Sequence, residues 1–171
     1  MRAELKYGLL AGFAVCLWML IEYALGLHTK YLDAWQYTDA ASFIVFVPPL
    51  WLLLKSRQAA LAPGEPLSLL VAVLQAMLMS LIAALVIYVF TVAYTFFLNP
   101  GWVDTVLAWK VEHWRAAHET EESIRRQITS YRNLHAPVGL AASLLISTPL
   151  LGGILAVFLT VWLNLRARRA R

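Results

Sequence analysis

Glu22 is the residue whose type and position in this chain point most directly to chemistry. It lies within an apolar run from Tyr7 to Leu27, shortly before His28. A carboxylate inside a membrane-spanning helix is costly unless it is neutral, paired or hydrated, and such residues often serve substrate or ion pathways. In the structural interpretation, Glu22 is a hydrogen-bond partner or lies near enough to the membrane surface to reach water. Its position near the end of the run favours the structural interpretation.

Further polar side chains recur at a similar depth in two later apolar runs. The third run carries Tyr88, Thr91, Tyr94 and Thr95, and the fourth begins with Ser143 and Ser147. We expect these groups to form a polar layer near one membrane surface. The candidate proton or polar site therefore consists of Glu22, Tyr88, Thr91 and Tyr94.

The chain offers little support for catalysis or metal binding. His113 and His118, with Glu112 and Glu119 beside them, suggest a metal site, but histidines five residues apart lie on different helix faces and match no zinc spacing. No Ser/His/Asp series, nucleotide-binding loop or redox motif is present. The single cysteine, Cys16, lies inside the first apolar run. We therefore expect no catalytic residues, no metal and no cofactor.

The elements that must position these residues are membrane-spanning helices. With 61% hydrophobic and 14% charged residues, the chain has more apolar surface than a soluble domain of 171 residues could bury. A hydrocarbon core about 30 Å thick requires roughly 20 helical residues. The sequence predicts an all-α, integral membrane four-helix bundle, a single domain over 1–171 with spans at about 7–27, 39–54, 67–98 and 138–165. The first run could be a signal peptide, but its length and Glu22 favour a retained anchor.

Two of the spans contain prolines. Pro48 and Pro49 interrupt the second span, which is also the shortest, and predict a kink near Val47. A re-entrant segment is the alternative for this span. Pro149 predicts a second bend in the last span, next to Gly152 and Gly153.

Basic residues predict the direction of the spans. Arg2 and Lys6 precede the first span, Lys55 and Arg57 follow the second, and four arginines follow the fourth. Because basic residues near span ends mark the cytoplasmic side, the sequence predicts an N-in, C-in, multi-pass membrane protein. The four C-terminal arginines equal the net charge of +4, which favours contact with anionic lipid headgroups over nucleic acid. The expected partners are membrane lipids and, as alternatives, another membrane protein or a second copy.

The connection 100–136 is predicted to be an extracytoplasmic amphipathic helical hairpin. Its helices are expected at about 102–118 and 120–134, with Thr120 as the N-cap of the second. Tryptophan prefers the headgroup layer, so the first helix is expected to lie on the outer leaflet. The hairpin is either a solvated cap on the bundle or a docking surface for a partner or lipid, formed by Trp102, Trp109, Trp114, Arg125 and Arg126.

Small residues predict where the spans pack. Gly8 and Gly12 form a G-x-x-x-G motif, and Gly152 and Gly153 are adjacent in the last span. A stripe of small or polar side chains on the third span comprises Ala76, Ser80, Ala84, Tyr88 and Thr91. Small faces let membrane helices approach closely, either within one chain or in a dimer.

The order of these features resembles a family known as domain of unknown function 4199. The resemblance rests on Lys6-Tyr7-Gly8 with Gly12, the basic turn at 55–57, Pro100 after the third span, a charged helical insert, and a Gly-Gly pair before a basic tail. It covers nearly the whole chain. The resemblance implies a four-helix, multi-pass domain of a bacterial inner membrane, and it assigns no activity and no functional residues.

From the residues, we expect a non-enzymatic accessory or scaffold subunit that engages membrane partners or lipids through its hairpin and spans. The alternative is a small transporter or channel that uses Glu22, either as a monomer or as a homo-oligomer. A membrane-embedded enzyme acting on lipid has no nucleophile–base pair to support it.

Overall fold

All regular secondary structure in the computed structural model of this chain is helical over the residues that it describes, 2–38, 41–62 and 65–169. In chain order, the helices are α1 (Arg2–Ala24), α2 (Leu32–Thr38), α3 (Ala41–Gln58), α4 (Leu69–Ala93), the π-helix η1 (Tyr94–Leu98), α5 (Trp102–Ala116), α6 (Glu121–His135) and α7 (Pro137–Arg169). The predicted all-α class is confirmed. The start of the predicted second span, at 39, and the last arginine of the basic tail, at 171, lie outside the described residues.

Four helical stretches are long and apolar enough to cross a membrane: Arg2–Ala24, Leu32–Gln58, Leu69–Leu98 and Pro137–Ala167. Large apolar side chains such as Phe13, Leu74 and Phe158 are exposed on their outer faces. In water this surface would be unfavourable, whereas lipid covers it without cost. The chain is therefore a membrane protein.

The prolines do not interrupt the helices that contain them. Pro48 and Pro49 lie inside α3, and Pro149 lies inside α7, each of which is one continuous helix in the described residues. A continuous α3 favours a crossing helix over the re-entrant alternative. The helix extends past the predicted end of the span, to Gln58, where Lys55 lies 4.7 Å from the ring centroid of Trp51.

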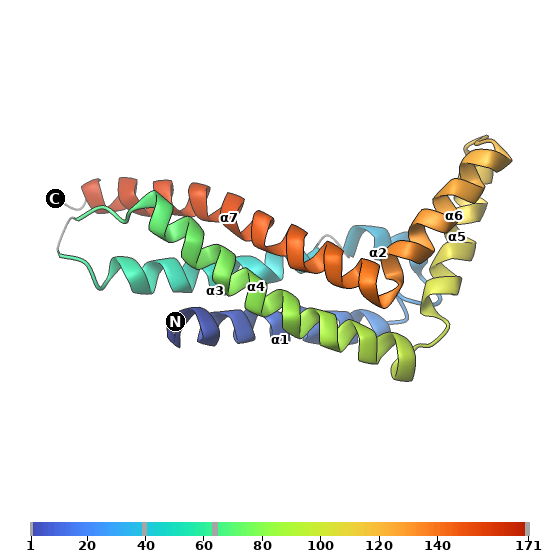
Figure 1. The fold of residues 1–171 in the computed structure, drawn as a ribbon, viewed down its shortest axis with the longest axis horizontal. Coiled ribbons are helices and arrows are strands. Elements are labelled where there is room, and N and C mark those ends of the chain that lie inside the picture. Colours follow the sequence, from blue (N-terminus) through green and yellow to red (C-terminus); the bar gives the residue numbers. More distant parts are fainter. Residues whose placement is uncertain (1, 39–40, 63–64, 170–171) are drawn as a thin grey trace.

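Helix α4 is the centre of the bundle and packs against both α1 and α7 (Figure 1). A Cβ atom at Gly8 would lie 2.7 Å from the carbonyl oxygen of Met79, and one at Gly12 would lie 2.7 Å from the Cβ of Val86. A Cβ at Gly152 would lie 1.9 Å from Ser80 Oγ, and Gly153 faces the side chain of Met77. The structure thus uses all four glycines for contacts between α4 and its two neighbours.

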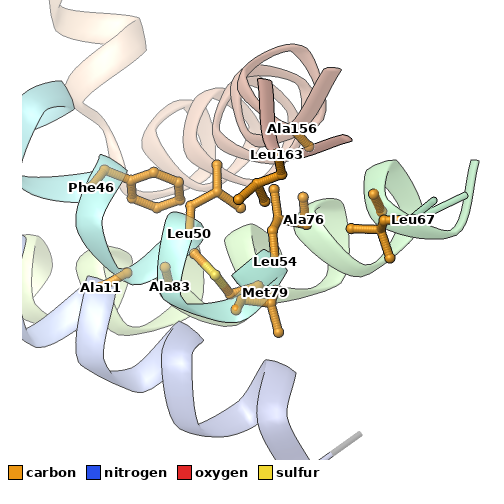
Figure 2. Packing of buried hydrophobic residues seen from close by; sticks show 12 residues of the cluster. Ala11, Phe46, Leu50, Leu54, Leu67, Ala76, Met79, Ala83, Ala156 and Leu163 are labelled. Atoms are coloured by element: carbon orange, nitrogen blue, oxygen red, sulfur yellow. The ribbon is translucent and has the colours of Figure 1, made fainter. Parts of the chain in front are cut away.

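One end of the bundle, here called the basic end, holds the start of α1, the connection between α3 and α4, and the end of α7 (Figure 1). Figure 2 shows Leu50 and Leu54 of α3 filling the space between α4 and α7, close to Met79 and Leu163. Polar contacts secure the same end. The side chain of Asn164 accepts from the Leu67 backbone N–H at 2.9 Å and donates to its carbonyl at 3.0 Å.

The opposite, hairpin end carries α5 and α6, which project away from the bundle axis (Figure 1). Thr120 caps α6 as predicted, because its hydroxyl accepts from the Ser123 N–H at 3.3 Å. The apolar residues of the hairpin pack differently from the expectation of an outer-leaflet helix. Trp102, Val106 and Ile124 are buried, and Trp102 and Val106 pack in one cluster with aromatic side chains of other elements, such as Tyr94 and Trp35.

Candidate functional site

A cavity of about 630 Å³ lies at the hairpin end, within the size range of small-molecule sites. Every helical span contributes to its wall, together with both hairpin helices. Its lining residues are Val15, Met19, Glu22, His28, Trp35, Ser42, Phe43, Phe46, Ile87, Thr91, Trp102, Lys110, Tyr131, His135, Leu140, Leu144, Ser147, Thr148 and Leu151. We call this set the hairpin cavity.

The hairpin cavity begins where the leucine core of the basic end stops. Phe46 belongs to that core and also lines the cavity, so it marks the boundary between the two. One turn before Phe46, toward the start of α3, Ser42 lines the cavity. Ser147 and Thr148 line it on α7. Short side chains on both helices leave a space that the bundle does not fill.

A chain of hydrogen bonds connects Glu22 to Tyr94 of η1 and to Asn99 just after it. Asn99 Nδ2 donates to the Tyr94 hydroxyl at 3.0 Å, the Tyr94 oxygen lies 2.6 Å from His28 Nδ1, and His28 Nε2 lies 3.4 Å from Glu22 Oε2. The contacts are compatible with donation from Nε2–H of His28 to Glu22, while Nδ1 shares a proton contact with the Tyr94 hydroxyl. His28 thus links Glu22 to Tyr94.

Two residues of the cavity wall hold a buried polar atom for which the described residues offer no hydrogen-bond partner and which matters for ligand binding. Glu22 Oε1 is an acceptor, and Trp102 Nε1 is a donor. Glu22 is 2% exposed and Trp102 is 7% exposed, and both residues line the cavity. A buried polar group without a partner costs free energy, so each such group in a native fold needs an explanation.

Aromatic rings surround the polar part of the cavity. The Trp102 ring centroid lies 5.9 Å from that of His28, 6.2 Å from that of Trp35 and 5.6 Å from that of His135. Lys110 contacts aromatic rings as well, with its Nζ 5.6 Å from the Tyr131 centroid. The site therefore combines one acidic group with an aromatic wall.

The π-helix η1 places Tyr94 in this site. The Asn99 N–H donates to the Tyr94 carbonyl at 2.8 Å, a bond that spans five residues where an α-helix would span four. π-Helical turns are rare and frequently occur at functional sites. Here the wider turn ends the third span at Leu98, as predicted, and Tyr94 is almost fully buried between His28 and Trp102.

The structure brings together three of the four predicted polar-site residues. Glu22 and Thr91 line the cavity, and Tyr94 adjoins it through His28. Tyr88 is only partly buried and is not among the lining residues. Ser147, which was expected at the same depth, does line the cavity.

The residues of the predicted hairpin surface differ in their exposure to solvent. Trp102, expected to face lipid or a partner, is instead buried in the cavity wall because its ring fits among aromatic neighbours. Trp109 is partly buried, and its Nε1 donates to Asp33 Oδ1 at 2.9 Å, which ties α5 to α2. Trp114 is partly buried, while Arg125 and Arg126 are exposed.

Sequence reasoning missed several site residues: Trp35, Lys110, Tyr131, His135 and Asn99, and it named His28 only as a neighbour of Glu22. Helix α2 was assigned to a connection, although Leu32 and Trp35 have the three-residue spacing of a helix face. No sequence signal indicated the π-helix that orients Tyr94.

Comparison with known families gives one match. Residues 6–163 match the family described as "Protein of unknown function (DUF4199)". Comparisons with curated proteins and with solved structures gave no significant match. The match agrees with the resemblance noted from the sequence and assigns no residue a role.

Proposed function

The chain belongs to the family described as "Protein of unknown function (DUF4199)", and we propose that it is a non-enzymatic accessory membrane protein that holds an amphipathic ligand in the hairpin cavity. The observation that carries this proposal is the composition of the cavity wall. Unpartnered buried atoms of Glu22 and Trp102 lie at one part of it, and apolar side chains such as Ile87 and Leu144 form the rest. Such a wall suits a molecule with a polar group and an apolar body.

The non-enzymatic part of the proposal is supported by the position of Tyr94. Its contact with His28 and Glu22 has the order hydroxyl, imidazole, carboxylate, which is also the order of groups in hydrolase triads. However, the Tyr94 hydroxyl also accepts from Asn99, and the side chain is only 1% exposed. A nucleophile must contact its substrate, so we assign this hydroxyl to holding His28 in place.

Native mass spectrometry of the protein released from mild detergent tests ligand holding. The wild type is expected to carry a co-purifying amphiphile, and Leu144→Trp, which fills the cavity, is expected to lose it. Ile146→Trp is the matched control, because Ile146 is exposed on the same helix. An apo wild type, or a Leu144→Trp protein that is folded by circular dichroism and carries as much amphiphile, would refute the proposal.

For orientation, we propose N-in and C-in in a bacterial inner membrane, with the hairpin outside the cytoplasm. Lys55, Arg57 and Arg166 support this orientation, because they belong to the basic end together with the start of α1 and the end of α7 (Figure 1). Labelling of Arg125→Cys in a Cys16→Ser background, with a membrane-impermeant maleimide on intact cells, is expected to succeed. Labelling only after the cells are permeabilised would reverse the orientation.

The exposed hairpin arginines are proposed to contact a membrane partner. Arg125 and Arg126 lie on the part of the molecule that projects beyond the bundle (Figure 1). Reversal of both charges to Glu is expected to abolish co-purification of another membrane protein from crosslinked membranes. Unchanged co-purification would remove the hairpin from the interface.

A small transporter is the second candidate, and the buried carboxylate on the cavity favours it. Glu22 lies deep in the wall, while the leucine core closes the basic end. A transporter must open that core to release its substrate. If the Glu22 carboxylate carries the coupled proton or ion, uptake into proteoliposomes should fall in Glu22→Gln. The absence of uptake by wild-type protein would leave ligand holding as the function.

A further inference from the structure

The acidic and basic side chains that line the hairpin cavity contact different kinds of neighbours. Among the described residues, Glu22 is the one acidic residue in its lining and Lys110 the one lysine, with His28, His135 and Tyr131 as the other titratable groups. Lys110 lies over the rings of Tyr131 and Trp109, at 5.6 and 5.7 Å from their centroids. It is also eight residues beyond Trp102 on α5, which places it roughly 12 Å further along that helix. The charged or polar side chain that contacts Glu22 is therefore a histidine and not a lysine or arginine.

The free oxygen of Glu22 selects among ligands. A carboxylate removed from water is compensated by a positive charge or by strong hydrogen-bond donors, and its Oε1 has neither among the described residues. An anionic ligand would be repelled at this position. A neutral ligand would leave the carboxylate without a counter-charge.

The aromatic rings near Glu22 favour the same class of ligand. His28, which contacts Glu22, has the Trp35 and Trp102 rings at centroid distances of 6.1 and 5.9 Å. The faces of tryptophan rings attract cations, and this attraction is strongest where water is excluded. A carboxylate beside tryptophan rings is a common arrangement for organic cations, which need both a counter-charge and apolar contact.

The α1 wall gives the direction of the apolar part of the ligand. Val15, Met19 and Glu22 share one face of α1 and line the cavity in that order. The seven residues from Glu22 back to Val15 correspond to roughly 10 Å along the helix, directed into the bundle. Phe46, Ile87 and Leu144 line the cavity with them. A cation at Glu22 would thus have an apolar space beside it for its substituents.

From this arrangement we infer that the hairpin cavity takes a lipophilic organic cation, with its positive centre against Glu22 Oε1 and its apolar substituents along the face formed by Met19 and Val15. The inference rests on the ligand-binding function proposed above and names the class of ligand. It assigns Glu22 the role of counter-charge and Trp35 and Trp102 the role of aromatic wall.

Two probes of the same shape and opposite charge test the inference: tetraphenylphosphonium and tetraphenylborate. Their binding to the full-length protein in maltoside micelles is measured by equilibrium dialysis against empty micelles. Wild type is expected to bind the cation and to bind the anion at least about tenfold more weakly, a difference of about 1.4 kcal/mol. Glu22→Gln should lose this preference, while Glu122→Gln, which changes a carboxylate that is 83% exposed, should keep it.

The outcomes separate the inference from the proposed function. Equal binding of both probes by wild type, abolished for both by Leu144→Trp, would overturn charge selection while the cavity remains an amphiphile site. No binding of either probe would overturn the inference as well. If Glu22→Gln does not fold, Trp35→Leu provides the test, because it should weaken cation binding several-fold and leave the anion unaffected. Unchanged cation binding in that folded variant would count against the aromatic wall.

Discussion

Glu4 and Glu22 are the two acidic residues of α1, each 2% exposed, and they lie in the two contrasting ends of the molecule. Eighteen residues separate them, or roughly 27 Å of helix. Glu4 Oε1 contacts Arg57 Nη2 at 2.5 Å in the basic end, whereas Glu22 Oε2 contacts His28 Nε2 at 3.4 Å in the hairpin end. The same residue type on one helix, equally buried, thus has a strong counter-ion at one end and a weak partner at the other.

This difference indicates which end contributes more to the stability of the fold. The basic end combines a tightly filled leucine core, an ion pair and an asparagine that bonds both backbone groups of Leu67. Buried polar atoms without a hydrogen-bond partner among the described residues occur at both ends, for example Arg57 Nε and Glu22 Oε1, but Glu22 and Trp102 also line the hairpin cavity. Natural proteins keep unfilled space beside unsatisfied groups mainly where function requires it. We therefore expect substitutions at the basic end to change stability and substitutions at the hairpin end to change binding.

The largest expected effect comes from truncation of the core on α3. Leu54→Ala removes a fully buried side chain and should lower the free energy of unfolding by about 3 kcal/mol. Phe43→Ala, on the same helix at the cavity, should cost less than about 1 kcal/mol because Phe43 is half exposed. Unfolding in mixed micelles, followed by tryptophan fluorescence, measures both. Equal costs would show that the two ends are equally packed.

The two carboxylates give the next largest difference. Glu4→Gln should destabilise the protein by about 2 kcal/mol, because the ion pair with Arg57 is lost. The cost is lower than for a fully buried ion pair, because Arg57 retains some access to water. Glu22→Gln should change stability by less than about 1 kcal/mol, because an amide at this position can still accept from His28. The same unfolding assay decides, and a larger cost for Glu22→Gln would make that residue a structural partner.

A smaller effect is expected from Tyr94→Phe. Loss of the hydroxyl removes the acceptor of Asn99 and the partner of His28 Nδ1, at a cost of about 1 kcal/mol. Because His28 then loses its orientation, binding of tetraphenylphosphonium should weaken while stability changes little. Tyr88→Phe is the matched control, since Tyr88 does not line the cavity. Equal effects of the two variants would exclude the hydrogen-bond chain from ligand binding.

The helices could be predicted from the sequence because lipid imposes a simple length and polarity requirement. The apolar runs gave the four candidate spans, and Asn99-Pro100-Gly101 gave the end of the third. Helix ends were less predictable: α1 begins at Arg2 and α3 continues to Gln58, because a helix can extend past the hydrocarbon without a change in hydropathy. The orientation of the spans remains a prediction.

The candidate site could be predicted only in part. Glu22 stood out because a charge in an apolar run is unusual, but its partner His28 lies in a turn that hydropathy does not resolve. Trp102 was expected at the membrane surface from the general preference of tryptophan. Its burial depends on how α5 folds back onto α2 and η1, which is tertiary information that local sequence patterns do not contain.

The smallest effect is expected from the ion pairs of the hairpin. Arg132 lies 3.4 Å from Asp104, and both side chains are largely exposed. Exposed pairs of this kind contribute little because water and salt screen them, so Arg132→Gln should cost less than about 0.5 kcal/mol in the unfolding assay. The hairpin is instead held by the burial of Val106 and Ile124. A larger cost, reduced by added salt, would mean that ion pairs hold α5 and α6 in place over the hairpin cavity. Ligand binding would then depend on ionic strength.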